Sequence, residues 1–342
     1  MLSLFLPLLF AVPVLQASFD LALTDHLTSS SVAVVDTLQI VEWTVPWKSS
    51  RPRDPYVAPD GRVWFCGQAG GYIGVLDPRD GSFEQFDLGE GAGPHNLIVD
   101  DAGMVWYAGN RRAHIGKLNP ESGEITKFQM PEPDARDPHT LIFDHNGHIW
   151  FTLQQSNMVG RLHMTSGNVE IIRVPTPGAR PYGIKMAPDG FIWVALFGTN
   201  KLARIDPDNL HLSEIELSRP GARPRRLEIT QDGAVWFVDY AEGFLGRYDA
   251  VSGEIVEWKI KGSGQSRPYG TAIDENGVFW FVDGGSTPNQ FIGFDTRSRV
   301  FTSRTAIPSG GGTVRHMYFH SASREIWFGT DTNTIGKAMI PE

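Results

Sequence analysis

A tryptophan at the centre of a hydrophobic run recurs seven times along this chain of 342 residues. Successive tryptophans are 42, 44, 43, 43, 44 and 47 residues apart. A repeat of this length, rich in strand-forming and turn residues, is typical of the four-stranded blade of a β-propeller. We therefore predict an all-β fold in which residues 37–342 form a single domain with seven blades. The seven runs are Val63-Trp64-Phe65, Val105-Trp106-Tyr107, Ile149-Trp150-Phe151, Ile192-Trp193-Val194, Val235-Trp236-Phe237, Phe279-Trp280-Phe281 and Ile326-Trp327-Phe328.

The second repeat shows how one blade divides into strands. Turn residues separate four hydrophobic stretches, at 94–99, 104–108, 115–118 and 125–130. Asn-Gly and Asp-Gly pairs such as Asp60-Gly61 and Asn146-Gly147 precede most of the tryptophan strands. Such pairs tolerate the positive φ angles of two-residue hairpins. The tryptophan strands lack alternating polar residues, so we expect both of their faces to be buried between blades.

The two ends of the repeat region complement each other. The seventh repeat stops at Glu342 without a fourth strand, and residues 38–46 match the fourth-strand pattern found at 255–258. We predict that this N-terminal strand completes the last blade. Its pairing there would cover a sheet edge that is otherwise exposed.

The N-terminal residues differ in composition from the repeats. Residues 2–17 are almost wholly apolar, and Ala17-Ser18 is a plausible cleavage point. The stretch is too short to span a membrane, so it predicts a secretory signal peptide over residues 1–17 and export to the periplasm or the medium. An uncleaved hydrophobic N-terminus is the alternative. Residues 18–36 would form a leader segment.

The overall charge excludes some classes of partner. A net charge of −9 disfavours general binding to nucleic acid or to anionic membranes. Cys66 is the only cysteine, so no internal disulfide can form. We expect a monomer without a stable membrane anchor.

The side chains at the entrance of each predicted inner strand are candidates for a binding site. All but the last follow a proline, which fixes the backbone where the strand begins. In a propeller these positions surround the central channel, and polar groups that converge on a concave surface are a usual sign of ligand binding. Packing at a strand end is the simpler explanation for any one of them. The seven residues are Tyr56, His95, His139, Tyr182, Arg225, Tyr269 and His316.

Arginines gather in the same part of each repeat. Their planar guanidinium groups suit carboxylate, ester carbonyl or phosphate oxygens. We expect a channel mouth that is more positive than the rest of the surface and a small-molecule ligand that is neutral or anionic. Pairing with acidic neighbours such as Asp54 and Asp239 is the alternative. The arginines are Arg136, Arg180, Arg223, Arg225, Arg226, Arg267 and Arg315.

Familiar catalytic and metal motifs are missing from the sequence. It contains no His-Glu-x-x-His motif, no cluster of cysteine and histidine residues, and no Gly-x-Ser-x-Gly motif. Hydrolysis by a serine nucleophile therefore has no support. Candidate ligands for a hard cation are the carboxylates that follow tryptophan strands, Asp239, Asp283 and Asp331.

Parts of the repeat resemble the virginiamycin B lyase family, whose members are also called streptogramin B lyases. The stretches that carry the resemblance are Arg180-Pro181-Tyr182-Gly183-Ile184, Gly198-Thr199-Asn200-Lys201-Leu202 and Arg267-Pro268-Tyr269-Gly270. The similarity runs from about residue 37 to the end of the chain. It implies a carbon–oxygen lyase that opens a cyclic depsipeptide at its ester bond by elimination. It also implies that a magnesium ion polarises the ester and that a histidine of the last blade is the general acid or base.

The resemblance also implies roles for particular residues. His316 corresponds to the catalytic histidine and Asp331 to a carboxylate that binds Mg²⁺, the expected cofactor. From their place at the channel mouth, and not from the resemblance, the other six entrance residues and Arg315 are the candidates for binding the substrate. Two positions differ from the family: Val314 replaces a second metal-binding carboxylate, and Tyr269 replaces a substrate-binding histidine.

Two other functions remain open. A secreted propeller could use the same arginine, histidine and tyrosine residues to bind a ligand without chemistry. A metal-dependent lactone hydrolase would need several carboxylates around the channel, where this sequence has arginines. Elimination instead needs a base that removes a proton next to a carbonyl group, and positive charge that stabilises the enolate. Nearby arginines should lower the pKa of His316 and keep it neutral.

Overall fold

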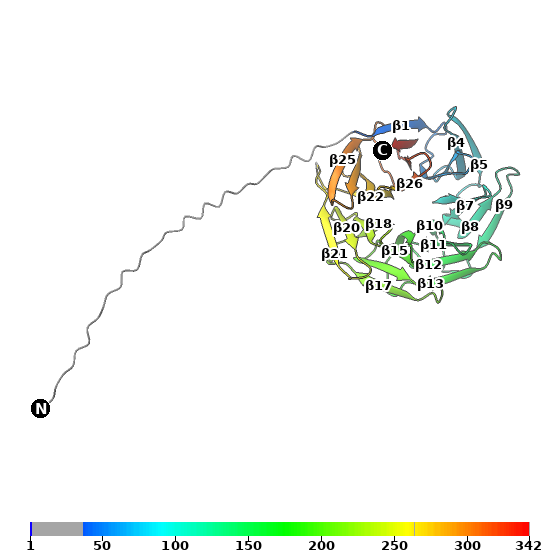
Figure 1. Ribbon diagram of the computed structural model, residues 1–342. Helices are drawn as coiled ribbons and strands as arrows, with labels where there is room; N and C mark the ends of the chain where they lie inside the picture. The colour runs from blue at the N-terminus through cyan, green and yellow to red at the C-terminus, as the bar shows by residue number, and fades with distance from the viewer. Residues whose placement is uncertain (2–36, 263, 342) are drawn as a thin grey trace. The chain divides into compact units, whose positions relative to one another are not determined.

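The protein is a seven-bladed β-propeller, as the sequence predicts. In the computed structural model, which describes residues 1, 37–262 and 264–341, seven four-stranded antiparallel sheets stand side by side in a ring (Figure 1). Among these residues the only helix is the short 3₁₀ turn η1 (Asn110–Arg112). The predicted signal peptide and leader fall on residues 2–36, outside the described residues.

Each blade runs outward from the channel in chain order. The last blade is the exception, because its outermost strand is β1. The strands are β2 (Pro52–Val57), β3 (Val63–Gly67), β4 (Tyr72–Asp77) and β5 (Ser82–Asp87) in blade 1; β6 (Leu97–Val99), β7 (Val105–Gly109), β8 (His114–Leu118) and β9 (Ile125–Gln129) in blade 2; β10 (Pro138–Phe143), β11 (His148–Leu153), β12 (Met158–His163) and β13 (Val169–Arg173) in blade 3; β14 (Pro181–Met186), β15 (Ile192–Leu196), β16 (Lys201–Ile205) and β17 (Leu212–Glu216) in blade 4; β18 (Pro224–Ile229), β19 (Val235–Asp239), β20 (Phe244–Tyr248) and β21 (Ile255–Lys259) in blade 5; β22 (Pro268–Ile273), β23 (Val278–Asp283), β24 (Gln290–Asp295) and β25 (Val300–Ala306) in blade 6; and β26 (Met317–His320), β27 (Glu325–Gly329), β28 (Thr334–Met339) and β1 (Gln39–Thr44) in blade 7.

The tryptophan strands form the core between blades. Strands β3, β7, β15 and β19 are buried at every residue. Trp106 of blade 2, for example, packs in a hydrophobic cluster that also contains Leu141 and Phe151 of blade 3. Burial of both faces explains why these strands lack the alternation of polar and apolar residues found in strands with one solvated face.

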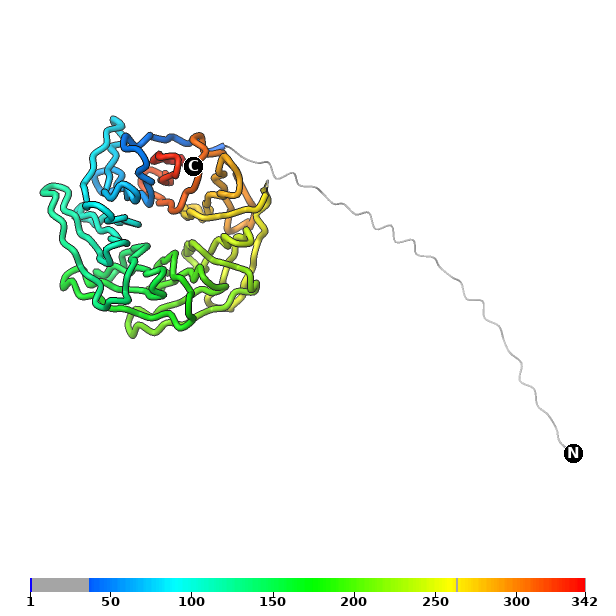
Figure 2. Tube along the Cα trace, turned by 180° about the vertical axis from the view of Figure 1, so that it is seen from behind, coloured from blue at the N-terminus to red at the C-terminus, as the bar shows by residue number. Residues whose placement is uncertain are grey.

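Strand β1 closes the ring, as predicted. It pairs with β28 along its whole length, from Gln39 opposite Met339 to Thr44 opposite Thr334. The blue N-terminal strand lies beside the red C-terminal strand in both views (Figures 1 and 2). Trp43 stacks on Trp327 with ring centroids 5.6 Å apart. This pairing covers the outer edge of β28, and β1 takes the outermost place that the fourth strand holds in each of the other blades.

The inner strands carry an irregularity that decides which side chains reach the channel. In β10, Pro138 pairs with Leu153, and the register shifts by one residue before Leu141. Strands β2, β14, β18 and β22 show a shift at the same place. A β-bulge adds one residue to a strand and redirects a side chain. Two successive residues, such as His139 and Thr140, can therefore both face the channel, although regular alternation would allow only one.

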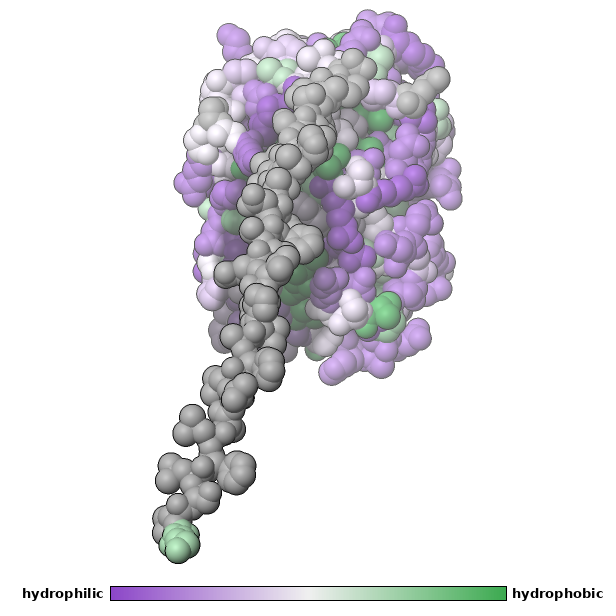
Figure 3. Space-filling view, turned by 60° about the vertical axis from the view of Figure 1, so that its left-hand side comes forward, coloured by the Kyte–Doolittle hydropathy of each residue, from purple (hydrophilic) through white to green (hydrophobic). Residues whose placement is uncertain are grey.

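The outer surface of the ring is mostly hydrophilic in the view of Figure 3, with small separate hydrophobic areas. Within the described ranges, Val251 and Val300 are the only exposed large hydrophobic side chains besides Met1. No helix in this part of the chain is long and apolar enough to cross a membrane.

Replacing Trp43 tests whether β1 holds the ring closed. Trp43→Ala removes the stack on Trp327, and we expect it to lower the free energy of unfolding by about 2–4 kcal/mol in urea denaturation. Trp258→Ala is the matched control, because Trp258 makes the equivalent stack on Trp236 inside blade 5, with ring centroids 5.5 Å apart. Since β21 is continuous with its own blade, this variant should lose less stability. Equal losses would contradict a closing role for β1.

Candidate functional site

The strand register corrects the predicted entrance residues in two blades. In blade 1, the pairing of β2 with β3 shows that Arg53 occupies the position that His139 occupies in blade 3. Tyr56 lies three positions farther along the chain. In the last blade the residue at this level is Arg315, and His316 lies one position farther along the chain. The predicted alignment of Tyr56 and His316 with the others is therefore wrong. The corrected set, which we name the upper ring, is Arg53, His95, His139, Tyr182, Arg225, Tyr269 and Arg315.

The sequence did contain a signal for the first of these corrections. The proline before each upper-ring residue lies 12 positions ahead of its tryptophan in blades 2 to 6. At this spacing the matching proline of blade 1 is Pro52, whereas Pro55 lies only 9 positions ahead of Trp64. In the last blade, Val314 stands 13 positions ahead of Trp327, because the hairpin there is one residue longer.

A second ring of residues lies one position farther along each inner strand. Contacts across the axis show that its side chains face the channel. Arg226 of blade 5 donates through Nη1 to Thr140 Oγ1 of blade 3 at 3.1 Å and through Nε to the carbonyl oxygen of Arg315 in blade 7 at 3.1 Å. Its Nη2 lies 3.7 Å from Asp54 Oδ2 of blade 1. We name this set, Asp54, Asn96, Thr140, Gly183, Arg226, Gly270 and His316, the lower ring.

The upper ring is not the open cup that the sequence predicts. Nη1 of Arg53 lies 3.0 Å from His95 Nε2, and the ring centroids of His95 and His139 lie 3.6 Å apart with the planes tilted by 37°. The ring of Tyr182 follows at 4.1 Å from His139. These four side chains are between 1% and 8% exposed. The prediction of an exposed cup is therefore wrong here, since the side chains fill the channel at this level.

The half-buried Arg225 belongs to an aromatic cluster on the other side of the upper ring. The Tyr182 and Tyr269 hydroxyl groups form a hydrogen bond across the channel. The Arg225 guanidinium carbon lies 3.6 Å from the ring centroid of Tyr269 and 4.3 Å from that of Tyr240. Cation–π contacts of this kind stabilise a guanidinium group without consuming all of its donors. The buried Nε of Arg225 indeed has no hydrogen-bond partner among the described residues.

The positive charge around the channel changes the acidity of the upper-ring side chains. Burial alone would raise the pKa of Tyr182, but Arg225, Arg226 and Arg53 outweigh burial and lower it below the ordinary 10.0. Burial, with Arg226 and Arg53, holds the pKa of His139 well below its usual range. The histidines are therefore neutral near pH 7, and the guanidinium groups supply the positive charge.

His316 lies in the lower ring, beside a cavity of about 250 Å³. Its pKa is lowered to about 3, mainly by burial, with smaller contributions from Arg226 and Lys185, while Asp54 acts in the opposite direction. Nδ1 of His316 is buried and has no partner among the residues that the structure describes. The structure thus gives a neutral imidazole beside a cavity, as predicted, but burial contributes more to its low pKa than the arginines do.

The cavity beside His316, which we name the lower cavity, follows the inner strands toward their far ends. Lys185 Nζ lies 2.7 Å from a carboxylate oxygen of Glu228, and Thr271 donates to that carboxylate at 2.9 Å. Tyr56 stacks on Tyr318 at 4.2 Å. The residues lining the cavity that matter for its chemistry are His316, Arg226, Lys185, Glu228, Tyr56 and Tyr318.

Asp331, the expected magnesium ligand, is held by arginine. Arg315 donates to both oxygens of its carboxylate, through Nη2 at 2.7 Å to Oδ2 and through Nη1 to Oδ1. A second cation, Arg51, has its Nε 3.8 Å from Oδ1 of Asp331. Burial would raise the pKa of this carboxyl group, but the Arg315 guanidinium keeps it below its usual range. The place next to Asp331 is thus occupied by a side-chain cation.

This donor set does not fit a magnesium site. The residue two positions before His316 is Val314, whose side chain offers no ligand. Across residues 37–262 and 264–341, no group of three or more histidine, cysteine, aspartate or glutamate side chains could hold a metal ion. Mg²⁺ is usually held by one or two carboxylates and several waters, and the one carboxylate offered here is already paired with a guanidinium group. The magnesium cofactor stays a prediction.

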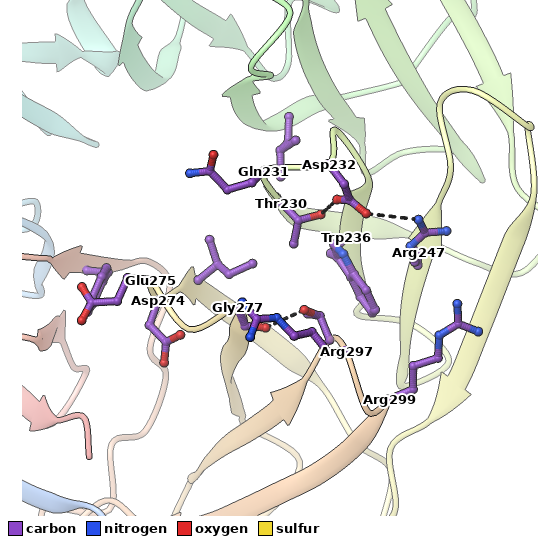
Figure 4. A pocket seen from close by; sticks show the side chains of 14 residues that line it. Thr230, Gln231, Asp232, Trp236, Arg247, Asp274, Glu275, Gly277, Arg297 and Arg299 are labelled. Atoms are coloured by element: carbon purple, nitrogen blue, oxygen red, sulfur yellow. Dashed lines mark hydrogen bonds and ion pairs between the residues drawn. The ribbon is translucent and has the colours of Figure 1, made fainter. Parts of the chain in front are cut away.

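A larger cavity, of about 620 Å³, lies apart from both rings, between the hairpins of blades 5 and 6. Figure 4 shows Asp232 beside Thr230 and Arg247, with Arg297 and Arg299 on the opposite wall. Trp236 lines this cavity. None of the predicted site residues lies there, so its size alone does not make it the functional site.

The fold and the channel define a class of protein: a seven-bladed propeller with two rings of cationic, aromatic and imidazole side chains on its axis. The chain belongs to the virginiamycin B lyase family, whose family model matches residues 28–338. A search of curated proteins finds no match.

Solved structures of lyases resemble this protein over most of its length. Virginiamycin B lyase from Staphylococcus aureus is 24% identical, with a TM-score of 0.80 over 89% of this chain and 100% of that one. A catalytically inactive histidine-to-alanine variant of that lyase, solved with quinupristin, gives the same values. A streptogramin B lyase is 26% identical, with a TM-score of 0.79 over 89% of this chain and 98% of that one.

The pKa of Tyr182 can be tested by titration. Because its pKa is lower in the folded chain than in the unfolded chain, this group's contribution to stability grows as the pH rises toward 10 and is lost as the pH falls through the folded-state pKa. Tyrosinate absorbance, assigned with Tyr182→Phe, should show this group titrating below pH 10. Arg225→Met should raise its pKa, whereas Arg267→Met, which removes a cation beside Tyr240, should not. No shift in Arg225→Met would contradict the assigned cause.

Proposed function

We propose that this protein is a carbon–oxygen lyase that opens an ester bond of a cyclic or ester-linked small molecule by β-elimination. The observation that carries the proposal is His316, a neutral imidazole with an unpartnered buried nitrogen among the described residues, beside a cavity that contains cationic side chains. Membership of a lyase family supports the same reaction class. The lyase structures of the family include one with quinupristin, so a streptogramin is a reasonable first substrate to test.

In the proposed reaction His316 removes a proton from the carbon next to a carbonyl group. Electrons from that C–H bond form a carbon–carbon double bond, the C–O bond on the alkyl side of the ester breaks, and a carboxylate leaves. Arg226 and Lys185 lie close enough to His316 to influence its pKa, and we propose that they stabilise the negative charge of the enolate and the leaving carboxylate. Asp54, which raises the pKa of His316, would stabilise the imidazolium ion that forms.

The geometry also limits the substrate. A cavity of about 250 Å³ is small for a drug-sized ligand. We propose that the ester enters the lower cavity while any larger part of the molecule stays outside it. The smallest probe with the required arrangement is an O-acylated serine or threonine amide, in which the ester oxygen is β to a carbonyl group.

A non-catalytic binding propeller is the second candidate, and two observations favour it. Arg315 occupies both oxygens of the carboxylate expected to hold a metal. A pKa of about 3 also makes His316 a weak base, since proton transfer is most efficient when the pKa is close to the working pH. Under this alternative, the same ligand binds and leaves unchanged.

Replacing His316 tests the catalytic proposal. We expect His316→Ala to lower kcat by about 100-fold or more for elimination of the O-acylated threonine amide or a streptogramin. His320→Ala is the control, because His320 bonds to Ser323 at the surface and should keep full activity. Calorimetry of both variants would show whether they still bind the ligand. Full activity in His316→Ala would contradict the proposed role of His316. Binding without turnover in the wild type would favour the non-catalytic binding propeller.

The pairing of Arg315 with Asp331 predicts how activity responds to metal. Because the guanidinium group already occupies the carboxylate, we expect the initial rate of the wild type to be the same with added Mg²⁺ and with a chelator. Arg315→Ala releases Asp331, so this variant alone should respond to Mg²⁺. A wild-type rate that disappears with chelator would contradict our interpretation of the pair and support the magnesium prediction.

A further inference from the structure

The channel contains more positive than negative charge. Arg53, Arg225 and Arg226 each bring one guanidinium charge to the two rings, and the carboxylate of Asp54 lies against two of them. The other charged groups nearby are paired: Lys185 with Glu228 and Arg315 with Asp331. Burial and the arginines lower the pKa values of the three channel histidines, so these side chains add no charge near pH 7. Three positive charges and one negative charge leave an excess of two.

Two of these guanidinium groups are almost completely buried. Arg53 and Arg226 are each 3% exposed, and they approach opposite oxygens of Asp54, at 2.9 Å and 3.7 Å. Each has a buried Nη2 with no hydrogen-bond partner among the described residues. Buried donors almost always have an acceptor in native proteins, and a buried charge needs a compensating one.

We propose that a small monovalent anion binds on the channel axis between Arg53 and Arg226, beside His316. The anion supplies the missing acceptor for the two Nη2 groups and reduces the excess charge from two to one. It reaches this position through the lower cavity, which Arg226 and His316 line. A halide such as chloride fits this chemistry, and so does the carboxylate group of a bound molecule. The proposal does not depend on lyase activity, because the charge excess exists whether the protein catalyses or only binds.

Thermal unfolding of the full chain in different sodium salts tests the proposal. Melting temperatures are measured at constant ionic strength in chloride, in formate and in gluconate, a bulky carboxylate that serves as control. Binding to the folded state should raise the melting temperature by about 3 °C in the favoured salt. A rise in chloride would assign the site to a free halide, and a rise in formate alone to the carboxylate of a ligand. Equal melting temperatures in all three salts would overturn the proposal.

Removing the positive charge of Arg226 and removing the negative charge of Asp54 should change the salt-specific rise in melting temperature in opposite directions. Arg226→Gln should abolish the salt-specific rise, whereas Asp54→Asn removes a competing negative charge and should enlarge it. Arg219→Gln is the matched control, because Arg219 pairs with Asp239 and Glu257 away from the channel and should keep the rise. Unchanged behaviour in both channel variants would contradict the assigned position.

Crystals soaked in bromide test the site without any variant, in case Arg226→Gln does not fold. The proposal expects a bromide anomalous peak within hydrogen-bonding distance of Nη2 of Arg53 and Arg226. If formate alone raised the melting temperature, a formate-soaked crystal replaces the bromide one and should show the carboxylate in the same place. An axis that binds neither anion would overturn the proposal.

Discussion

Pairing of β1 with β28 is the constraint on which the channel depends. Without it, the last blade would have three strands, and blades 1 and 7 would keep only their direct contacts, such as the one between the rings of Tyr56 and Tyr318. Contacts across the axis, such as the bond from Arg226 to Thr140, exist only because the seven inner strands converge. The Trp43–Trp327 stack and the hydrogen bonds from Ser309 and Thr334 to Glu42 fix this closure. The site is thus assembled by the contact between the two ends of the domain.

Closure brings an unusual amount of positive charge onto the axis. A chain with a net charge of −9 brings three guanidinium groups to the two rings, and two of them, Arg53 and Arg226, lie against the buried carboxylate of Asp54. That charge lowers the pKa of Tyr182, acts with burial to keep the histidines neutral, and favours an anionic ligand or an anionic transition state. The pair formed by Arg315 and Asp331 extends the same principle, because a side-chain cation stands where the family resemblance placed a metal ion.

The sequence predicts much of the fold because the repeat encodes it redundantly. Seven tryptophan strands and the partial last repeat were enough to predict the number of blades and the closing strand. The site was less predictable. A β-bulge lets two successive residues of an inner strand reach the channel at different levels, and the longer hairpin of the last blade places Arg315 in the upper ring and His316 in the lower ring. A regular alternation rule would have missed Asp54 and Arg226 as well. The burial of the upper ring also depends on packing across the axis, as between Tyr182 and Tyr269, which no local pattern reveals.

The choice between elimination, hydrolysis and simple binding is the central question that this site poses. Mass spectrometry of a streptogramin B depsipeptide or an O-acylated threonine amide, incubated with the protein in ¹⁸O-labelled water, answers it most directly. Our account predicts products that contain no label: a ring-opened depsipeptide of unchanged mass, or an unlabelled carboxylic acid and an unsaturated amide. Incorporation of labelled water would show hydrolysis and contradict the role given to His316. Recovery of unchanged ester, with binding still detectable, would show that the protein holds such molecules without cleaving them.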